Sequence, residues 1–388
     1  MPAMHSPALR CDILVLGGGL AGSAAAYYLA REGAEVVVVE RFDLNTQASG
    51  SNAGSLHAQI AHEPFVGEGE GWARNFAPTI RLLVQSIKIW QGLEAELGAD
   101  LEVSVHGGLL LAENETQAAD IRRKMAIERE YGLEVEWIER AGLANLAPYA
   151  SPRMVGGAFC PSEGKANPLK ATPAFVRAAD KHGARFLTHR NVTGLAPESG
   201  GYRVETSAGP IQARRVINSA GAEAGRIAGF LGIDLPIEGH PIQVNVTEPV
   251  APFIPHLVYS AGEKLTLKQA KNGSLLIGGG WPARWSSAVK RPAVDRASLR
   301  SNLATAMAVV PQVGSARLLR VWPAVVNGTA DWRPILGEVP GLPGFFMNFF
   351  PWMGFTAGPL CAQITAALVL GRQPPVDISG FAGNLKRA

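Results

Sequence analysis

A glycine cluster close to the start of the chain constrains the fold more than any other feature. The apolar run at residues 12–16 leads into Gly17-Gly18-Gly19-Leu20-Ala21-Gly22, and a second apolar run at 36–39 ends in Glu40. This order predicts a strand, a tight turn, a helix and a second, parallel strand. Units of this kind bind a dinucleotide when the glycines let its pyrophosphate reach the helix N-terminus.

Each of these positions has a physical role in a dinucleotide site. Gly17 permits the tight turn, Gly19 lets the backbone approach the pyrophosphate, and Gly22 lets the helix pack closely on the sheet. Glu40 lies roughly 20 residues past the glycines, where an acid accepts hydrogen bonds from ribose hydroxyls and disfavours the 2′-phosphate of NADP. The motif does not separate FAD from NAD, and a glycine-rich turn in an ordinary βαβ unit is the alternative.

The composition excludes several other classes of protein. The chain has 388 residues, of which 47% are hydrophobic and 18% charged, which predicts one large or two intertwined globular domains rather than a disordered chain. A net charge of +3 is too small to indicate a nucleic-acid partner. No apolar run reaches the roughly 18 residues that span a bilayer, and residues 1–8 lack the apolar core of a secretory signal.

The cysteines and histidines predict no metal site. Cys11, Cys160 and Cys361 are far apart and odd in number, which is typical of a reducing compartment, and we therefore expect a cytoplasmic protein. Without a C-x-x-C pair the chain cannot hold an iron–sulfur cluster or a structural zinc in the usual way. The eight histidines show no ligand-like spacing.

Four further motifs follow in order along the chain. A loop of small and hydroxyl residues at 48–59 can wrap a phosphate or ribityl chain, and a surface loop is the alternative. Residues 215–222 form an apolar run that ends in Ala220-Gly221-Ala222. Short alternating runs from 241 to 278 predict antiparallel strands. A glycine turn at 354–358 opens a last apolar helix, whose N-terminus favours an anionic group.

Taken together, these motifs, with Gly278-Gly279 and the segment 331–337, resemble the FAD-dependent D-amino acid oxidase superfamily. Within it, the chain is similar to the glycine oxidase, sarcosine oxidase and D-amino acid dehydrogenase branch. The resemblance implies an α/β fold class, α+β overall, with a Rossmann-like FAD-binding domain and a discontinuous antiparallel-sheet substrate domain. We place the FAD-binding domain at 10–85, 151–225 and 320–388. The substrate-binding domain then comprises 86–150 and 226–319.

The resemblance also implies the chemistry and the cofactor contacts. The expected reaction dehydrogenates the C–N bond of an amino acid, imino acid or secondary amine by hydride transfer to flavin N5. The cysteine that anchors flavin covalently in monomeric sarcosine oxidases corresponds to Ala324, so we expect noncovalent FAD. The implied FAD contacts are Gly17, Gly19, Gly22, Glu40, Arg41, Ser49, Asn52, Gly54, Val192, Ala220, Gly354, Phe355 and Thr356.

The chain departs from the family pattern at the substrate. Val326 stands where several of these oxidases carry an arginine that binds the substrate carboxylate, and Thr266 stands where they carry a tyrosine. Pro351-Trp352-Met353 replaces the usual Gly-His before the last glycine turn. Aromatic residues that could wall an apolar pocket, or simply pack in the core, are Trp281, Trp285, Trp322, Trp352 and Tyr259.

A different cation must therefore bind the carboxylate of an amino-acid substrate. Candidates are Lys268, Arg284 and Arg333, with His57 and His240 as weaker ones, and a solvated charge is the alternative for each. We name His57, Thr266, Lys268 and Arg284 as the candidate catalytic residues. His57 would face the flavin or the substrate, although a lone histidine is more often structural.

Two other functions fit the same motifs. The chain could be the FAD-bearing subunit of an amino-acid, opine or hydroxyproline dehydrogenase that passes electrons to a partner subunit or a quinone. It could also be a flavin-binding protein whose amine site has degenerated, because the expected arginine and tyrosine are both missing.

Overall fold

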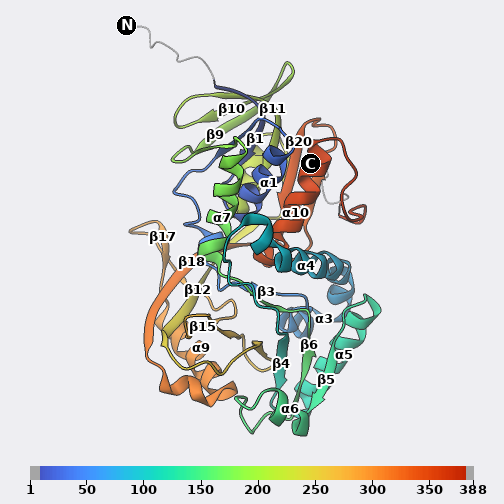
Figure 1. Ribbon diagram of the computed structural model, residues 1–388, viewed down its shortest axis with the longest axis vertical. Helices are drawn as coiled ribbons and strands as arrows, with labels where there is room; N and C mark the ends of the chain where they lie inside the picture. Colours follow the sequence, from blue (N-terminus) through green and yellow to red (C-terminus); the bar gives the residue numbers. More distant parts are fainter. Residues whose placement is uncertain (1–8, 382–388) are drawn as a thin grey trace. The chain divides into compact units, whose positions relative to one another are not determined.

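A computed structural model describes residues 9–381 of the chain (Figure 1). Residues 1–8, for which no secretory signal is predicted, lie outside the described part, as do residues 382–388. The chain forms two compact units. Within the described residues, the first unit comprises 9–50, 169–239 and 327–381, and the second comprises 51–168 and 240–326.

The boundaries of these units differ from the predicted domain boundaries. Residues 51–85, 151–168 and 320–326 belong to the second unit, whereas 226–239 belong to the first. The reason is pairing that joins distant parts of the chain. Strand β6 (Gly156–Cys160) pairs with β4 (Gly108–Ala112), so this segment folds with the second unit.

The first unit is built on an eight-stranded sheet with the path β19-β20-β11-β1-β2-β8. The bounds along this path are Ile335–Glu338, Phe345–Phe349, Ile211–Asn218, Leu9–Leu16, Val36–Val39 and Arg185–Leu187. Strands β20, β11, β1, β2 and β8 are parallel, and β19 is antiparallel to β20. The hairpin of β9 (Val192–Glu198) and β10 (Gly201–Thr206) extends from β11. This is the doubly wound, Rossmann-like arrangement that the glycine motif predicts.

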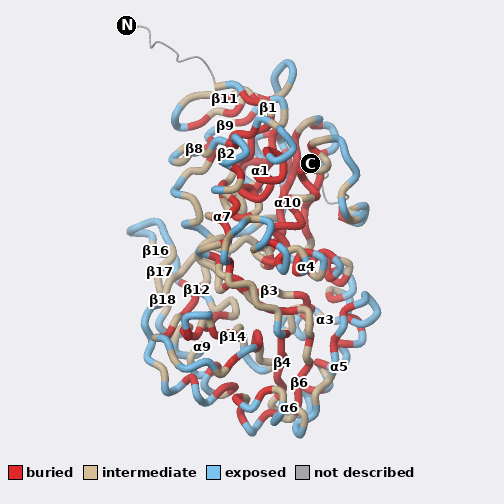
Figure 2. Tube along the Cα trace, viewed as in Figure 1, coloured by how far each residue is buried: buried red, intermediate tan, exposed pale blue. Residues whose placement is uncertain are grey.

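Helices cover both faces of this sheet. On one face α1 (Leu20–Arg31) packs on α10 (Gly354–Val369), and both helices are largely buried (Figure 2). The alanines of α1 at 24–26 are fully buried. On the other face α8 (Ala224–Gly229) packs into the cluster that contains Leu14 and Leu16. Helix α7 (Pro168–Lys181) precedes β8. Helix α1 begins at Leu20, directly after the glycine turn.

The second unit contains another eight-stranded sheet, in the order β18-β12-β15-β14-β13-β4-β6-β5. The bounds of strands not yet given are β18 Leu318–Gly328, β12 Glu238–Pro249, β15 Ser274–Gly278, β14 Thr266–Gln269, β13 Leu257–Ser260 and β5 Glu136–Glu139. From β12 to β5, neighbouring strands are antiparallel except for β13 and β4, which are parallel. The predicted antiparallel substrate-domain sheet is therefore present.

The two faces of this second sheet differ in chemistry. Val258, Leu267 and Ile277 lie on the face that packs against α9 (Arg296–Val309) in an apolar cluster. Because strand side chains alternate, the residues between them point to the opposite face. That face carries Tyr259 opposite Thr266, with Lys268 two residues further along β14. We call it the polar face of the second unit.

The remaining elements complete the second unit, apart from α2 and η2. Their bounds are α2 Ala48–Ser51, β3 Ser55–Leu56, α3 His62–Phe76, η1 Ala77–Thr79, α4 Ile80–Leu97, α5 Glu115–Glu130, α6 Arg140–Leu146, β7 Gly164–Lys165, η2 Gly221–Glu223, β16 Arg284–Ser286, β17 Arg291–Ala293 and η3 Pro311–Ser315. The apolar periodicity around residues 74–97 spans two helices, since Pro78 interrupts it in η1. Within the described chain, no helix is long and apolar enough to cross a membrane.

Candidate functional site

The first candidate site is the edge of the first sheet where β1, β2 and β11 end. Gly17 follows β1, Glu40 follows β2 and Ser219 follows β11. Carboxyl ends of parallel strands meet at one edge, where doubly wound sheets bind ligands. The backbone confirms the proximity, because Gly17 N donates to Val39 O and Ser219 N donates to Leu16 O, both at 2.9 Å.

The glycine turn at this edge has no room for side chains. Gly17 has φ +107°, and a Cβ there would lie 2.5 Å from Ser219 O. A Cβ on Gly22 would lie 2.0 Å from Gly17 O, and one on Gly19 would lie 2.8 Å from Ser49 Oγ. The turn and the helix start therefore need glycine at these positions, as the motif predicts.

Two predicted cofactor contacts brace this turn. Glu40 accepts hydrogen bonds from Gly18 N and Phe42 N, each at 2.9 Å. Ser49 Oγ accepts from Leu20 N at 2.9 Å, so it satisfies one of the unpaired amides of the first turn of α1. A carboxylate has about four lone-pair positions, so Glu40 keeps acceptor capacity for ribose hydroxyls.

The other predicted FAD contacts are divided between the units. Asn52 and Gly54 lie in the second unit, where Asn52 Oδ1 accepts from Gly54 N at 2.8 Å. The Arg41 guanidinium pairs with Glu223 at 3.4 Å. The remaining contacts, which lie in the first unit, are Val192 in β9, Ala220 after β11, and Gly354, Phe355 and Thr356 in the first turn of α10.

Asn348 is a structural link at this edge that the sequence motifs do not reveal. Its side chain is buried in β20 and donates to Ser219 Oγ at 3.0 Å and to Ala21 O at 3.3 Å. It therefore ties the end of β11 to the start of α1. The glycines keep side chains away from the turn, which lies at the N-terminus of α1. Together with the carboxylate of Glu40, this arrangement fits a dinucleotide.

A matched pair of glycine substitutions tests this cradle. Gly22→Ala forces a methyl group against Gly17 O, and overpacking of about 1–3 kcal/mol should weaken flavin binding by roughly 10- to 100-fold. Gly92→Ala in α4 meets no atom within 4 Å and should leave flavin content unchanged. The flavin-to-protein absorbance ratio after gel filtration measures both, and equal flavin content in the two variants would contradict this cradle.

The polar face of the second unit is a second candidate site, and Lys268 is the buried cation on it. The Lys268 side chain is 1% exposed. Among the described residues its Nζ atom has no hydrogen-bond partner. Burial, and then the charge of Lys165, lowers the pKa of Lys268 to about 7. A buried amine without a counter-ion is a costly feature that an anionic ligand would relieve.

The other predicted cations occupy different surroundings. Arg284 is exposed on the β16–β17 hairpin and pairs with Asp295 at 3.6 Å. Arg333 lies in the first unit, where it donates to Gly380 O at 2.5 Å and covers the Phe381 ring. His240 is half-buried in β12. Lys268 combines a buried side chain with an ammonium that has no hydrogen-bond partner among the described residues, whereas the guanidinium of Arg333 donates to Gly380 O.

His57 lies beside this lysine, and its ring is held by a tyrosine. His57 Nδ1 is 2.8 Å from the hydroxyl of Tyr259, which projects from β13 opposite Thr266. Burial, and then the charge of Lys268, lowers the pKa of His57 to about 3, so the ring is neutral. Thr266 is half-buried and has no charge. The tyrosine hydroxyl beside it comes instead from Tyr259 on the neighbouring strand β13.

A buried carboxylate organises the loop that carries His57. Glu163 Oε1 accepts from Ala58 N at 2.6 Å and from Gln59 N at 2.9 Å, and Gln59 Nε2 donates to Glu163 Oε2 at 2.9 Å. Burial, and then the charge of Glu163, raises the pKa of Tyr259 well above its ordinary value. The side chain of Glu163 is fully buried, and burial raises its pKa.

An ion pair continues this network away from His57. Lys124 and Glu128 of α5 are both fully buried and form a short hydrogen bond one helical turn apart. Lys124 Nζ also donates to Gln59 Oε1 at 3.3 Å, and Glu128 Oε1 accepts from Ile60 N at 2.8 Å. Sequence reasoning missed this network because its residues are far apart in the chain. Lys124 and Glu128 lie in a helix that is rich in charged residues, so its sequence gave no signal that this pair is buried.

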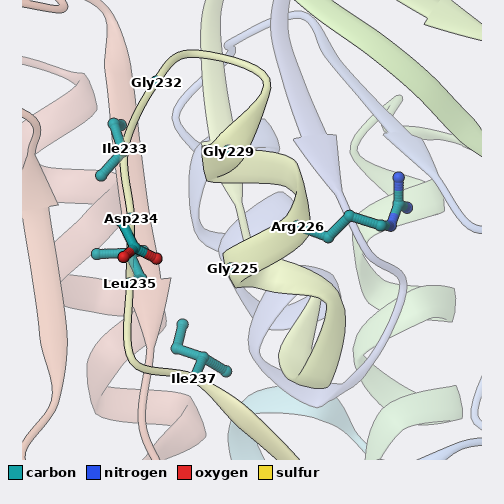
Figure 3. A pocket seen from close by; sticks show the side chains of 8 residues that line it. All are labelled: Gly225, Arg226, Gly229, Gly232, Ile233, Asp234, Leu235 and Ile237. Carbon is teal, nitrogen blue, oxygen red and sulfur yellow. The ribbon is translucent and has the colours of Figure 1, made fainter. Parts of the chain in front are cut away.

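The first unit also contains a depression that none of these groups lines. It has a volume of about 440 Å³ and lies beside α8 (Figure 3). Its lining residues are Gly225, Arg226, Gly229, Gly232, Ile233, Asp234, Leu235 and Ile237. Figure 3 shows Arg226 extending away from the loop that carries Asp234, and its guanidinium bonds Glu223 at 2.7 Å. The depression therefore brings no reactive groups together.

Comparisons with known proteins identify the family of this chain. A family model described as FAD dependent oxidoreductase matches residues 12–368. The chain is 27% identical over 391 residues to the beta subunit of sarcosine oxidase from Rhizobium meliloti (strain 1021), covering 97% of this chain and 88% of the relative. It is 25% identical over 382 residues to glycine oxidase of Geobacillus kaustophilus (strain HTA426), covering 96% of each.

Two further matches extend the comparison. The chain is 28% identical over 380 residues to one subunit of the opine oxidase of Rhizobium meliloti, covering 96% of each. The crystal structure of glycine oxidase from Geobacillus kaustophilus has a TM-score of 0.86 at 24% identity, covering 98% of this chain and 99% of that one. The predicted fold is confirmed by this likeness.

Proposed function

Because the chain belongs to the DAO family of FAD-dependent oxidoreductases, we propose that it oxidises the C–N bond of an amine that carries a carboxylate. The substrate class is an amino acid, an imino acid or an N-substituted amino acid. Relatives named for glycine, sarcosine and opine support this class, since all three compounds are amines with a carboxylate.

The observation that carries the proposal is that Lys268 is buried and its Nζ has no hydrogen-bond partner among the described residues. Its buried ammonium supplies the cation that a substrate carboxylate requires. Val326 and Thr266, which stand where relatives carry an arginine and a tyrosine, have no charge. The cost of burying this amine falls when a carboxylate pairs with it. Lys268 binds the carboxylate, and the polar face around it orients the amine. This role replaces the degenerate-site hypothesis, because a dead site has no reason to retain an unsatisfied buried lysine.

Most of the proposed cofactor contacts lie in the first unit. Gly17, Gly19 and Gly22 receive the pyrophosphate, and Glu40 accepts hydrogen bonds from the ribose. Bound FAD supplies the two-electron acceptor for the oxidation. Ala324 offers no thiol for a covalent bond, so the cofactor is held by noncovalent contacts.

We further propose that the chain works with a partner subunit that receives its electrons. The support is that two relatives aligned over most of their length are named as subunits of sarcosine and opine oxidases. Co-purification of a second chain that restores electron transfer would support this arrangement. Full turnover with oxygen by this chain alone would contradict it.

We propose the cytoplasm as the compartment. Cys11, Cys160 and Cys361 are all unpaired and buried in the described structure, as suits a reducing environment. A reporter fused to this chain that becomes active only after export from the cytoplasm would contradict this location.

Anaerobic reduction of the bound flavin tests the proposed reaction. The purified protein is mixed without oxygen with D- and L-amino acids, prolines, N-methyl amino acids and opines, and the flavin absorbance is followed. Bleaching by one class identifies the substrate, and re-adding air separates an oxidase from a dehydrogenase. Bound flavin that none of these compounds reduces, with or without a co-purified partner, would overturn the proposal.

The pH dependence of carboxylate binding follows from the pKa of Lys268. A simple carboxylate such as acetate should inhibit competitively, with a constant Ki below about pH 7. Above that pH the ammonium loses its proton, so Ki should rise by about tenfold per pH unit. Lys271→Met, which removes an exposed lysine of the following turn, should keep this profile. A Ki that stays flat from pH 6 to 9 would contradict the assignment.

A further inference from the structure

Asn348 has a defined place in a row of residues that crosses the sheet of the first unit. The residues in register through the pairings of β2, β1, β11 and β20 are Val39, Leu16, Asn218 and Met347. The residues that directly follow them along the chain are Glu40, Gly17, Ser219 and Asn348. Asn348 therefore lies in the same row as the glycine turn, two strands from Gly17 and on the side opposite Glu40.

The side chain of Asn348 points to the face of the sheet on which α1 and α10 pack. Its neighbours in β20, Met347 and Phe349, belong to the apolar cluster on the α8 face. Because side chains alternate along a strand, Asn348 points to the opposite face. Its Nδ2 donates to Ala21 O at the start of α1, at 3.3 Å, and to Ser219 Oγ, at 3.0 Å. The amide therefore lies beside the turn at which the pyrophosphate is expected.

These contacts fix the direction in which the amide of Asn348 faces. A backbone carbonyl can only accept, so the atom that faces Ala21 is the nitrogen Nδ2. The two protons of this nitrogen are used by Ala21 O and Ser219 Oγ. The oxygen Oδ1 is therefore an acceptor, and among residues 9–381 it has no hydrogen-bond partner. The residue is only 3% exposed, so bulk water does not satisfy this atom.

A buried acceptor of this kind predicts a ligand that donates to it, because such an atom is costly when it stays unpaired. The pyrophosphate of a dinucleotide has no proton to donate, whereas the sugar hydroxyls on either side of it do. Glu40 is assigned to the adenosine ribose on one side of the turn, so the other half of the dinucleotide extends over β11 and β20. Neighbouring strands are about 4.8 Å apart, which puts Asn348 roughly 10 Å from Gly17 across the sheet. In FAD the group that follows the pyrophosphate on this side is the ribityl chain, which carries hydroxyls.

We infer that Asn348 is a cofactor-binding residue whose Oδ1 accepts a hydrogen bond from a hydroxyl of the ribityl chain of FAD. Its Nδ2 holds the amide in place on Ser219 and Ala21, and its Oδ1 binds the ligand. A neutral amide suits this position better than a carboxylate, because a charged acceptor would repel the nearby pyrophosphate. The inference rests on the FAD binding of the family and not on the amine that the enzyme oxidises.

The first test measures how fast flavin leaves the holoenzyme. Asn348→Leu keeps the branched shape of the side chain but removes Oδ1, so flavin release after dilution should be about tenfold faster than in the wild type. Flavin fluorescence follows the release. No substrate is added, so the result does not depend on whether an amine is oxidised. Release from Asn348→Leu at the wild-type rate would overturn the inference.

Thr365 provides a matched control in the same unit. Its Oγ1 is also buried and has no hydrogen-bond partner among the described residues. It lies toward the C-terminal end of α10, about 16 Å along the helix from Gly354. Thr365→Val removes this hydroxyl at nearly constant volume and should leave the rate of flavin release unchanged. If Thr365→Val released flavin as fast as Asn348→Leu, a change in core packing would explain both, and the inference would be wrong.

The second test separates a contact with the ribityl chain from a general loosening of the turn. The flavin-free full chain is titrated with FAD, with ADP, and with an FAD analogue that has a pentyl chain in place of the ribityl chain. Asn348→Leu should weaken the binding of FAD about tenfold, and that of ADP and the analogue by less than about twofold.

The opposite pattern would show a purely structural role. Asn348→Leu also breaks the link to Ser219 and Ala21, and loss of that link alone would weaken the binding of all three compounds equally. Equal weakening would therefore overturn the inference, and so would a water molecule in place of the hydroxyl at Oδ1, since FAD and the analogue would then lose the same affinity.

Discussion

Lys268→Met should raise KM for the amino-acid substrate by about 30- to 4,000-fold while making the protein more stable to heat. Truncating one partner of a buried charged pair costs roughly 2–5 kcal/mol, which sets this range. Stability should move the other way, because methionine fills a similar volume without an unsatisfied amine. Removing a buried polar group that has no partner gains roughly 1–3 kcal/mol.

The pH dependence of that stability gain has a definite sign. Lys268 has a folded-state pKa near 7, below its ordinary value of 10.5, so the unfolded chain binds more protons between these two values. The stability of the wild type therefore rises with pH across this window, and the advantage of Lys268→Met shrinks in parallel. Thermal unfolding at pH 6 and pH 9 measures the trend. A variant that binds substrate normally, or that is less stable at both pH values, would contradict the role of Lys268.

Lys124→Met should lower the free energy of unfolding by about 3–5 kcal/mol, the largest stability effect that we expect in the second unit. The substitution leaves the fully buried Glu128 carboxylate without its cation. Burial already raises the pKa of Glu128, and removal of the ammonium raises it further. Urea denaturation followed by circular dichroism measures the loss.

The double variant Lys124→Met/Glu128→Gln separates a charge effect from a packing effect. The glutamine is neutral, and its oxygen can still accept from Ile60 N. The double variant should therefore recover most of the stability that Lys124→Met loses. Arg123→Met, which removes an exposed neighbour on α5, should change stability by less than about 1 kcal/mol. A double variant as unstable as Lys124→Met would show that packing, not charge, sets the cost.

The cofactor unit could be predicted from the sequence because its signals are local. Gly17, Gly22 and Glu40 belong to one continuous strand–helix–strand segment, and each glycine has a geometric role that no larger residue fulfils. The two compact units differ from the predicted domains partly because β6 pairs with strands earlier in the chain.

The polar network could not be predicted because it depends on the register of distant strands. Gln59, Lys124, Glu163 and Tyr259 come from separate elements, and only the folded sheet brings them together. A sequence reveals that a lysine is present, but burial of Lys268 follows from its place on the polar face of β14. The presence of Val326 and Thr266, where relatives carry an arginine and a tyrosine, did indicate that another residue must bind the carboxylate.

The central claim is that this chain oxidises amines that carry a carboxylate, and one comparison tests it most directly. The rate of anaerobic flavin reduction is measured for the amino or imino acid that bleaches the flavin and for the same amine without its carboxylate, such as proline and pyrrolidine. The account predicts reduction by the carboxylate-bearing compound and a rate at least about 30-fold lower for its counterpart. Equal rates for both compounds would contradict it.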